Sequence, residues 1–233
     1  MLTAFSLEGI HLGGPWFYPR WVDRDQIHVA VAQERRRVAD LIDSLDEAQL
    51  ATESLCTGWD VKTVAAHLVS PLADGTVKPI LLRLCRPRGS LDRVVDERAR
   101  RRAQMPAAEI AATLRDLADH QYWYPPPQAA AARLAEVLSH SGDIRIPLGL
   151  PFEPDPQLTA TALDFLTGPV SLGLVPWGRL RGLRLHATDI NRGWGKDRKS
   201  EGGSGTDDGR GWTHRHVGCA RRVWIAPVTA ADI

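Results

Sequence analysis

The chain has 233 residues, of which 29 are Lys or Arg and 28 are Asp or Glu, and its formal net charge is +1. This balance gives no electrostatic reason to expect a nucleic acid or a membrane as partner, and no apolar run approaches the roughly 20 residues that cross a bilayer. Three scattered cysteines are too few for a disulfide framework, and the first residues lack a signal-peptide pattern. We therefore expect a soluble cytoplasmic protein.

The first predicted elements are helices. Apolar residues recur at helical spacing over residues 23–45, with charges between them. The sequence SLDE (44–47) has the form of a capping box, with Ser44 in the N-cap position, and predicts a new short helix. After a turn at CTGWD (56–60), Asp60 is placed to cap a helix over VKTVAAHLVSPL (61–72).

Further helices are expected before residue 150. They are GTVKPILLRLC (75–85), SLDRVVDERARRRAQ (90–104), PAAEIAATLRDLADH (106–120) and a helix from Gln128 to about His140. A break at Met105–Pro106 separates the second from the third, and YWYPPP (122–127) is not helical. This density of helices with short connections predicts an antiparallel bundle over residues 23–150.

A second domain is expected over residues 151–195. The proline-rich IPLGLPFEPDP (146–156) marks the boundary. Beyond it, PQLTATALDFLTG (156–168) has a helical pattern and RLRGLRLHATD (179–189) alternates as a strand does, so this part is predicted to be a partial α+β domain.

The two ends do not share these patterns. Residues 1–22 carry no helical period, and residues 196–233 are rich in glycine and charge. The plain interpretation is a poorly ordered extension and a disordered tail. Our sharper hypothesis is that the coding frame shifts near Lys196 and that translation begins near Val22. The intact mass of the natively expressed protein tests both, and a full-length mass with the written C-terminus would contradict the frameshift.

Three residues form a candidate metal site. Glu136 and His140 lie four apart on one predicted helix and project to the same side. His67 borders the buried face of another helix. Each feature alone has a plainer interpretation, a core histidine for His67 and an intrahelical polar pair for the other two. Together, two imidazoles and one carboxylate with a fourth position open are typical of catalytic zinc, and we favour metal binding.

These residues lie in segments that resemble a known family. The segments DSLDEAQLATESLCTGWDVKTVAAHL, AEVLSHSGDIRIPLGLP and RLRGLRLHATDINRGWG are similar to the mycothiol-dependent maleylpyruvate isomerase family, within the DinB-like helical-bundle superfamily. The resemblance covers roughly Asp23 to Gly195. It implies a mainly α fold, with an antiparallel four-helix bundle and a small α+β domain. It also implies a divalent metal, usually zinc, bound by His67, Glu136 and His140, and mycothiol as cosubstrate or cofactor.

The resemblance implies a small-molecule thiol and a small electrophile as partners. Zinc would hold a bound thiol as the thiolate, which adds to an unsaturated acid or displaces a leaving group. The expected function is therefore that of an isomerase or an S-transferase. The alternative is a non-catalytic metal- or thiol-binding regulatory module, and a third possibility is a broken gene product. The family pattern of a further strand and helix is lost after Gly195, so we carry over no catalytic residue from that part and regard the second domain as incomplete.

Other residues near these motifs have simpler expected roles. Asp143 is either an acceptor that orients His140 or a helix-end residue facing solvent, and the sequence leaves this open. Trp59 is expected to be a packing anchor. The run DERARRR (96–102) is predicted to be a solvated helix face. Cys56 lacks an adjacent histidine or a metal-type spacing, which disfavours a catalytic nucleophile there, as it does for Cys85.

Overall fold

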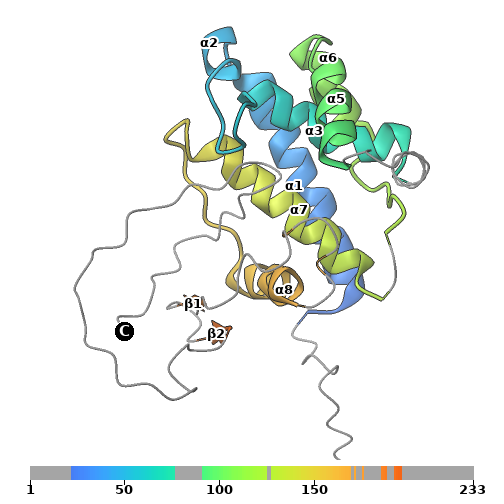
Figure 1. The fold of residues 1–233 in the computed structure, drawn as a ribbon, viewed down its shortest axis with the longest axis vertical. Helices are drawn as coiled ribbons and strands as arrows, with labels where there is room; N and C mark the ends of the chain where they lie inside the picture. The colour runs from blue at the N-terminus through green and yellow to red at the C-terminus, as the bar shows by residue number, and fades with distance from the viewer. Residues whose placement is uncertain are drawn as a thin grey trace, which may run out of the picture.

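The structure, a computed structural model, is mainly helical over the residues that it describes (Figure 1). These are residues 22–76, 91–124, 127–168, 171, 175, 185–187 and 192–195. The predicted helix at 75–85 lies almost entirely outside them, as do residues 1–21 and 196–233. None of the described helices is long and apolar enough to cross a membrane.

The helices follow the order expected from the sequence. They are α1 (Arg24–Ser44), α2 (Glu47–Leu50), α3 (Val61–Asp74), α5 (Leu91–Arg102), α6 (Ala107–Asp116), α7 (Ala129–Arg145) and α8 (Pro156–Thr167). The predicted break at Met105–Pro106 is confirmed between α5 and α6. Helix α7 runs five residues past His140, to Arg145.

Capping side chains set where α2 and α3 begin. The predicted short helix is confirmed as α2, but Ser44 is not its cap, because Ser44 is still the last residue of α1 and its hydroxyl donates to the carbonyl oxygen of Leu41 at 2.7 Å. Asp46 is the N-cap instead, and its carboxylate accepts from the backbone N–H of Gln49 at 2.8 Å. The predicted cap of α3 is confirmed, since the Asp60 carboxylate accepts from the backbone N–H of Thr63 at 2.7 Å.

Helix α1 packs against α3, α6 and α7, and α3 packs in turn against α5, α6 and α7. The larger core lies mainly between α1, α3 and α6, with fully buried side chains that include Val38, Ile42, Val64, Ile110 and Leu114. A second core joins α1, α7 and α8 through Ile27, Val31, Leu134, Leu138 and Phe165. Burial of each such side chain contributes about 1.5–3 kcal/mol. Because α1 contributes side chains to both cores, the two cores fix α3 and α7 relative to each other.

Helix α8 carries a short antiparallel strand pair, β1 (Leu185–Ala187) and β2 (Arg192–Trp194). The carboxylate of Asp164 on α8 accepts from the indole N–H of Trp194 at 2.7 Å and from the guanidinium of Arg192 at 2.6 Å. The Trp194 ring packs on Ala160 and Leu163 of the same helix. These contacts attach the strand pair to α8.

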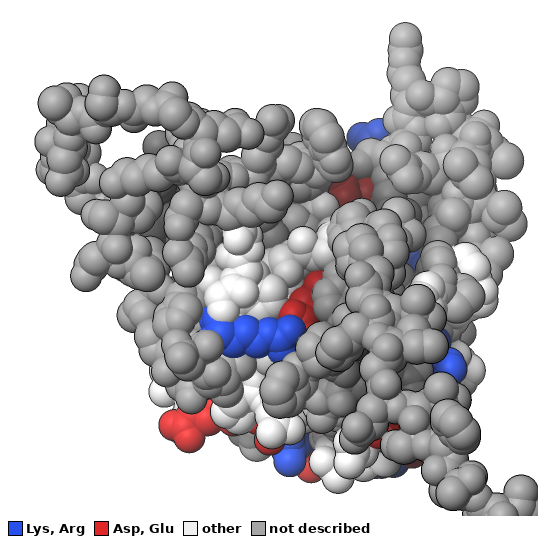
Figure 2. Space-filling view, turned by 90° about the horizontal axis from the view of Figure 1, so that it is seen from below, with Lys and Arg blue, Asp and Glu red and all other residues white. Residues whose placement is uncertain are grey.

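The basic run on α5 is only partly the solvated face that the sequence predicts. Arg100 is half exposed, but the side chains of Arg98 and Arg102 are only 17% and 16% exposed. Arg98 donates from Nη2 to the carbonyl oxygens of Ser70 and Gly75, both at 3.0 Å. The difference arises because Arg98 and Arg102 lie against the C-terminal end of α3, where both also pair with the carboxylate of Asp74. On the described part of the face shown in Figure 2, basic and acidic side chains likewise lie side by side.

Candidate metal centre

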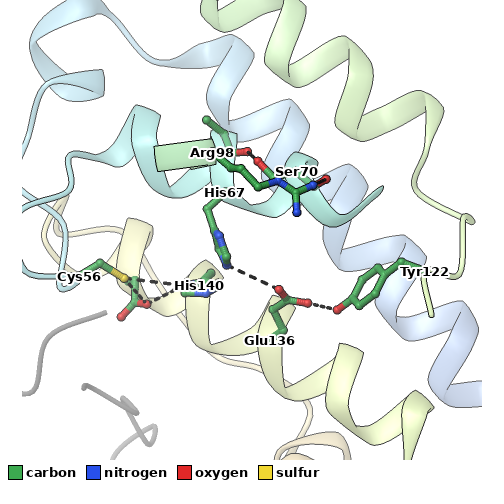
Figure 3. A network of polar contacts seen from close by, with 9 residues as sticks. Cys56, His67, Ser70, Arg98, Tyr122, Glu136 and His140 are labelled. Atoms are coloured by element: carbon green, nitrogen blue, oxygen red, sulfur yellow. Dashed lines mark hydrogen bonds and ion pairs between the residues drawn. The ribbon is translucent and has the colours of Figure 1, made fainter. Parts of the chain in front are cut away.

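Helices α3 and α7 bring the three predicted ligands together in the interior (Figure 3). His67 Nε2 lies 3.6 Å from Glu136 Oε1, and each of these side chains is 14% exposed. The ring of His67 meets that of His140 edge to face, with the centroids 4.8 Å apart. The side chains of all three residues therefore face one another across the interface of α3 and α7.

The separation of His67 and Glu136 has chemical meaning. At 3.6 Å the nitrogen and the oxygen are too far apart for a hydrogen bond. Two ligands on one tetrahedral zinc ion, each about 2.0–2.2 Å from the metal, lie about 3.4 Å apart. The observed spacing is thus closer to that of two atoms sharing an ion than to that of a direct contact.

His67 is also an incompletely satisfied core histidine. Its Nδ1 atom is buried and has no hydrogen-bond partner. Buried polar atoms are nearly always paired, and an exception calls for an explanation. In addition, Pro71 stands four residues later on α3 and has no N–H to donate to the carbonyl oxygen of His67. One ring nitrogen of His67 is therefore unsatisfied, and the other, Nε2, faces Glu136.

Asp143 orients His140. Its carboxylate is 1% exposed, and Oδ2 lies 2.9 Å from Nδ1 of His140. Of the two interpretations that the sequence left open, the structure agrees with the acceptor and not with the solvent-facing residue. Histidines that bind metals commonly donate their other ring N–H to a carboxylate in this way. The arrangement leaves Nε2 as the ring nitrogen of His140 suited to a ligand.

Cys56 lies beside this pair, which the sequence did not predict. Its sulfur is 3.1 Å from Asp143 Oδ2 and 3.8 Å from His140 Nδ1. In the described part of the chain, the three residues whose ligand atoms all lie within 4.8 Å of one another are Cys56, His140 and Asp143, and not the predicted three. However, Cys56 is disulfide-bonded, so its sulfur is not free to act as a thiolate ligand.

The position of Cys56 comes from tertiary structure. The backbone N–H of Leu55 donates to the carbonyl oxygen of Asp143 at 3.2 Å, which joins the turn before α3 to α7. Cys56 and Asp143, which are 87 positions apart in the sequence, are thereby brought together. The only available sequence signal was that Cys56 stands in the same motif as His67.

Tyr122 is a second residue that the sequence did not assign to the site. It lies in the non-helical segment before α7, is 6% exposed, and its hydroxyl donates to Glu136 Oε2. Trp59, by contrast, is the expected packing anchor. It is 6% exposed, its ring lies 5.2 Å from that of His67, and its indole N–H donates to Asp96 Oδ1 at 2.6 Å.

The protonation states are compatible with metal binding. Burial lowers the pKa of His67, so the imidazole is neutral at neutral pH. Burial alone would raise the pKa of Glu136, but the contact with His67 and the charge of His140 lower it. Burial would likewise lower the pKa of His140, but the hydrogen bond and charge of Asp143 raise it. Metals bind neutral imidazole and carboxylate, so a metal ion would displace any proton that His140 carries.

We compared the chain with known protein families. Residues 31–145 match the model of the mycothiol maleylpyruvate isomerase N-terminal domain. This part of the chain belongs to that family. No curated protein and no solved structure matches the chain. The mycothiol maleylpyruvate isomerase domain contains all three predicted ligands together with Cys56, Tyr122 and Asp143, and it ends with the last residue of α7. The resemblance suggested by the sequence motifs is therefore confirmed over residues 31–145, and the segment RLRGLRLHATDINRGWG lies outside the match.

Proposed function

We propose that the protein binds a divalent metal ion, zinc, through His67, Glu136 and His140. With it the protein would activate a low-molecular-weight thiol, mycothiol, for addition or transfer to a small electrophile. The observation that carries the proposal is the meeting of these three side chains between α3 and α7, inside a domain of the mycothiol maleylpyruvate isomerase family.

Each residue has a defined task in this proposal. Asp143 accepts from Nδ1 of His140 and thereby directs the Nε2 lone pair toward the ion. Glu136 supplies negative charge, and the buried His67 supplies a neutral nitrogen. The ring of Trp59 covers His67 and keeps water from that side. When bound, zinc lowers the pKa of a thiol, so that the thiolate is present at neutral pH.

We further infer that α1, α3, α6 and α7 form the DinB-like antiparallel four-helix bundle. Their mutual packing supports this assignment. We assign α8 with β1 and β2 to the smaller α+β domain at 151–195, because Asp164 ties both elements together. A thiol cofactor kept in its reduced form also fits a cytoplasmic location.

Elemental analysis of the purified protein tests the metal site. We expect stoichiometric zinc in the wild type and its loss in His67→Ala. His120→Ala is the matched control, because this histidine is exposed, and it should retain zinc. Cys56→Ser should retain it too, whereas zinc loss in Cys56→Ser with retention in His67→Ala would transfer the site to Cys56, His140 and Asp143. An unchanged or absent metal signal would remove the proposal.

A thiol-conjugation assay then separates an enzyme from a binding module. Purified zinc protein is incubated with mycothiol and a panel of small electrophiles, with His67→Ala as the control. Turnover that depends on zinc supports the enzyme. Saturable binding of mycothiol without turnover on any electrophile would support the alternative, a non-catalytic metal- or thiol-binding regulatory module.

A further inference from the structure

We propose that Tyr122 is a positioning residue for Glu136, and that two buried arginines, Arg35 and Arg133, hold Tyr122 in place. This inference rests on the proposed metal site. In it the tyrosine hydroxyl occupies one oxygen of the Glu136 carboxylate, so that the other oxygen is presented to the ion.

The two oxygens of Glu136 have different partners. Oε2 accepts a hydrogen bond from the Tyr122 hydroxyl, and Oε1 faces Nε2 of His67 at 3.6 Å. Figure 3 shows Tyr122 and His67 on opposite sides of this carboxylate. A carboxylate held in this way cannot rotate without breaking the tyrosine contact, so its orientation is fixed before any ligand arrives.

Arg133 holds the backbone of Tyr122. It lies on α7, one helical turn before Glu136, and is only 6% exposed. Its Nε donates to the carbonyl oxygen of Tyr122 at 3.0 Å, and its Nη2 donates to the same oxygen. Because Arg133 and Glu136 belong to one rigid helix, the distance from the Tyr122 backbone to the carboxylate is set by α7 itself.

Arg35 holds the same segment from α1. It is 4% exposed, and its Nη1 donates to the carbonyl oxygens of Ala118 and His120, both at 2.8 Å. The guanidinium carbons of Arg35 and Arg133 lie 5.7 and 5.4 Å from the centre of the Tyr122 ring. A buried guanidinium is costly unless it is paired. Here both guanidinium groups pair with the segment that carries Tyr122. Two buried arginines therefore hold the phenol ring of Tyr122 in place.

The arrangement explains why a residue outside any helix is deeply buried. Tyr122 precedes α7 in a segment without regular hydrogen bonding, yet its carbonyl, ring and hydroxyl each have a partner from the helices. A residue with only a covering role would need its ring alone. The hydroxyl contact to a ligand oxygen is the part that points to the metal.

Tyr122→Phe tests this inference by removing the hydroxyl and keeping the ring. The zinc affinity of purified protein is measured by competition with a chromophoric chelator, using zinc alone as the probe. Loss of such an outer contact typically weakens metal binding about 10- to 100-fold, which is the result expected. Tyr124→Phe is the matched control, because it loses a hydroxyl from the same segment while its ring packs on Phe165, and it should keep the wild-type affinity.

Far-UV circular dichroism verifies that both variants are folded, as the retained aromatic rings lead us to expect. A Tyr122→Phe affinity within about twofold of wild type would overturn the inference. His67→Ala measured in parallel separates the two levels of the argument. If His67→Ala loses zinc while Tyr122→Phe keeps it, only the role of Tyr122 falls; if His67→Ala also keeps zinc, the metal site itself is wrong.

Discussion

The two sides of the candidate metal centre are built differently. On the α7 side each proposed ligand is backed by a hydrogen bond, from Tyr122 to Glu136 and between His140 and Asp143. On the α3 side, Nδ1 of His67 is buried without a hydrogen-bond partner and the ring packs against Trp59.

The difference shows two ways of positioning a ligand. On α7 the side chains themselves are fixed by neighbouring polar groups. On α3 the helix is fixed instead, by Asp60 at its start and by Arg98 and Arg102 near its end. We therefore expect substitutions behind α7 to act on metal affinity, and substitutions around α3 to act first on stability.

The largest effect should come from Asp143→Asn. The amide carries no charge and supports the His140 N–H less well, so zinc affinity should fall about 10- to 100-fold. The matched change on the α3 side is Trp59→Phe, which keeps an aromatic ring near His67 but loses the hydrogen bond to Asp96 and part of the buried indole. Chelator competition should show a much smaller fall in zinc affinity for Trp59→Phe than for Asp143→Asn. Equal falls in zinc affinity would contradict the difference between the two sides.

An effect of similar size, but on folding and not on metal affinity, is expected from Arg98→Ala. It removes the hydrogen bonds to the carbonyl oxygens of Ser70 and Gly75 and the ion pair with Asp74, and we expect the free energy of unfolding to fall by about 1–3 kcal/mol. Arg93→Ala is the control on the same helix, because Arg93 is 80% exposed and makes only a surface ion pair; its effect should stay within about 0.5 kcal/mol. Urea unfolding measures both, and equal values would contradict the anchoring role of Arg98.

The smallest effect concerns pH. Burial would raise the pKa of Asp74, but the hydrogen bonds and charges of Arg102 and Arg98 outweigh it and lower the pKa below 3.8. A carboxylate with a lowered folded pKa stabilises the fold above 3.8 and loses that contribution as the pH falls through the folded value. The stability difference between wild type and Asp74→Asn should therefore be greatest above pH 3.8 and disappear in stronger acid. A difference that grows on acidification would contradict the pairing.

The parts that could be predicted from sequence are those that local patterns determine. Helical periodicity and the Asp60 cap identified α3, and the spacing of Glu136 and His140 on one helix placed them on one face. The start of α2 was misplaced because Ser44 and Asp46 are both good caps, and only the observed end of α1 decides between them.

The contacts that could not be predicted join distant segments. Tyr122 reaches Glu136 because two buried arginines hold a loop that has no pattern of its own, and Cys56 reaches Asp143 through a backbone hydrogen bond from Leu55. Neither contact leaves a period or a spacing in the sequence. Such neighbours become visible only when α1, α3 and α7 are packed together.

The most direct test of the central claim is anomalous diffraction at the zinc edge from crystals of the purified protein. We predict a single peak between α3 and α7, about 2.0–2.2 Å from an imidazole nitrogen of His67, an oxygen of Glu136 and Nε2 of His140. A peak bound instead by Cys56 and Asp143, or no peak in protein loaded with zinc, would contradict the account.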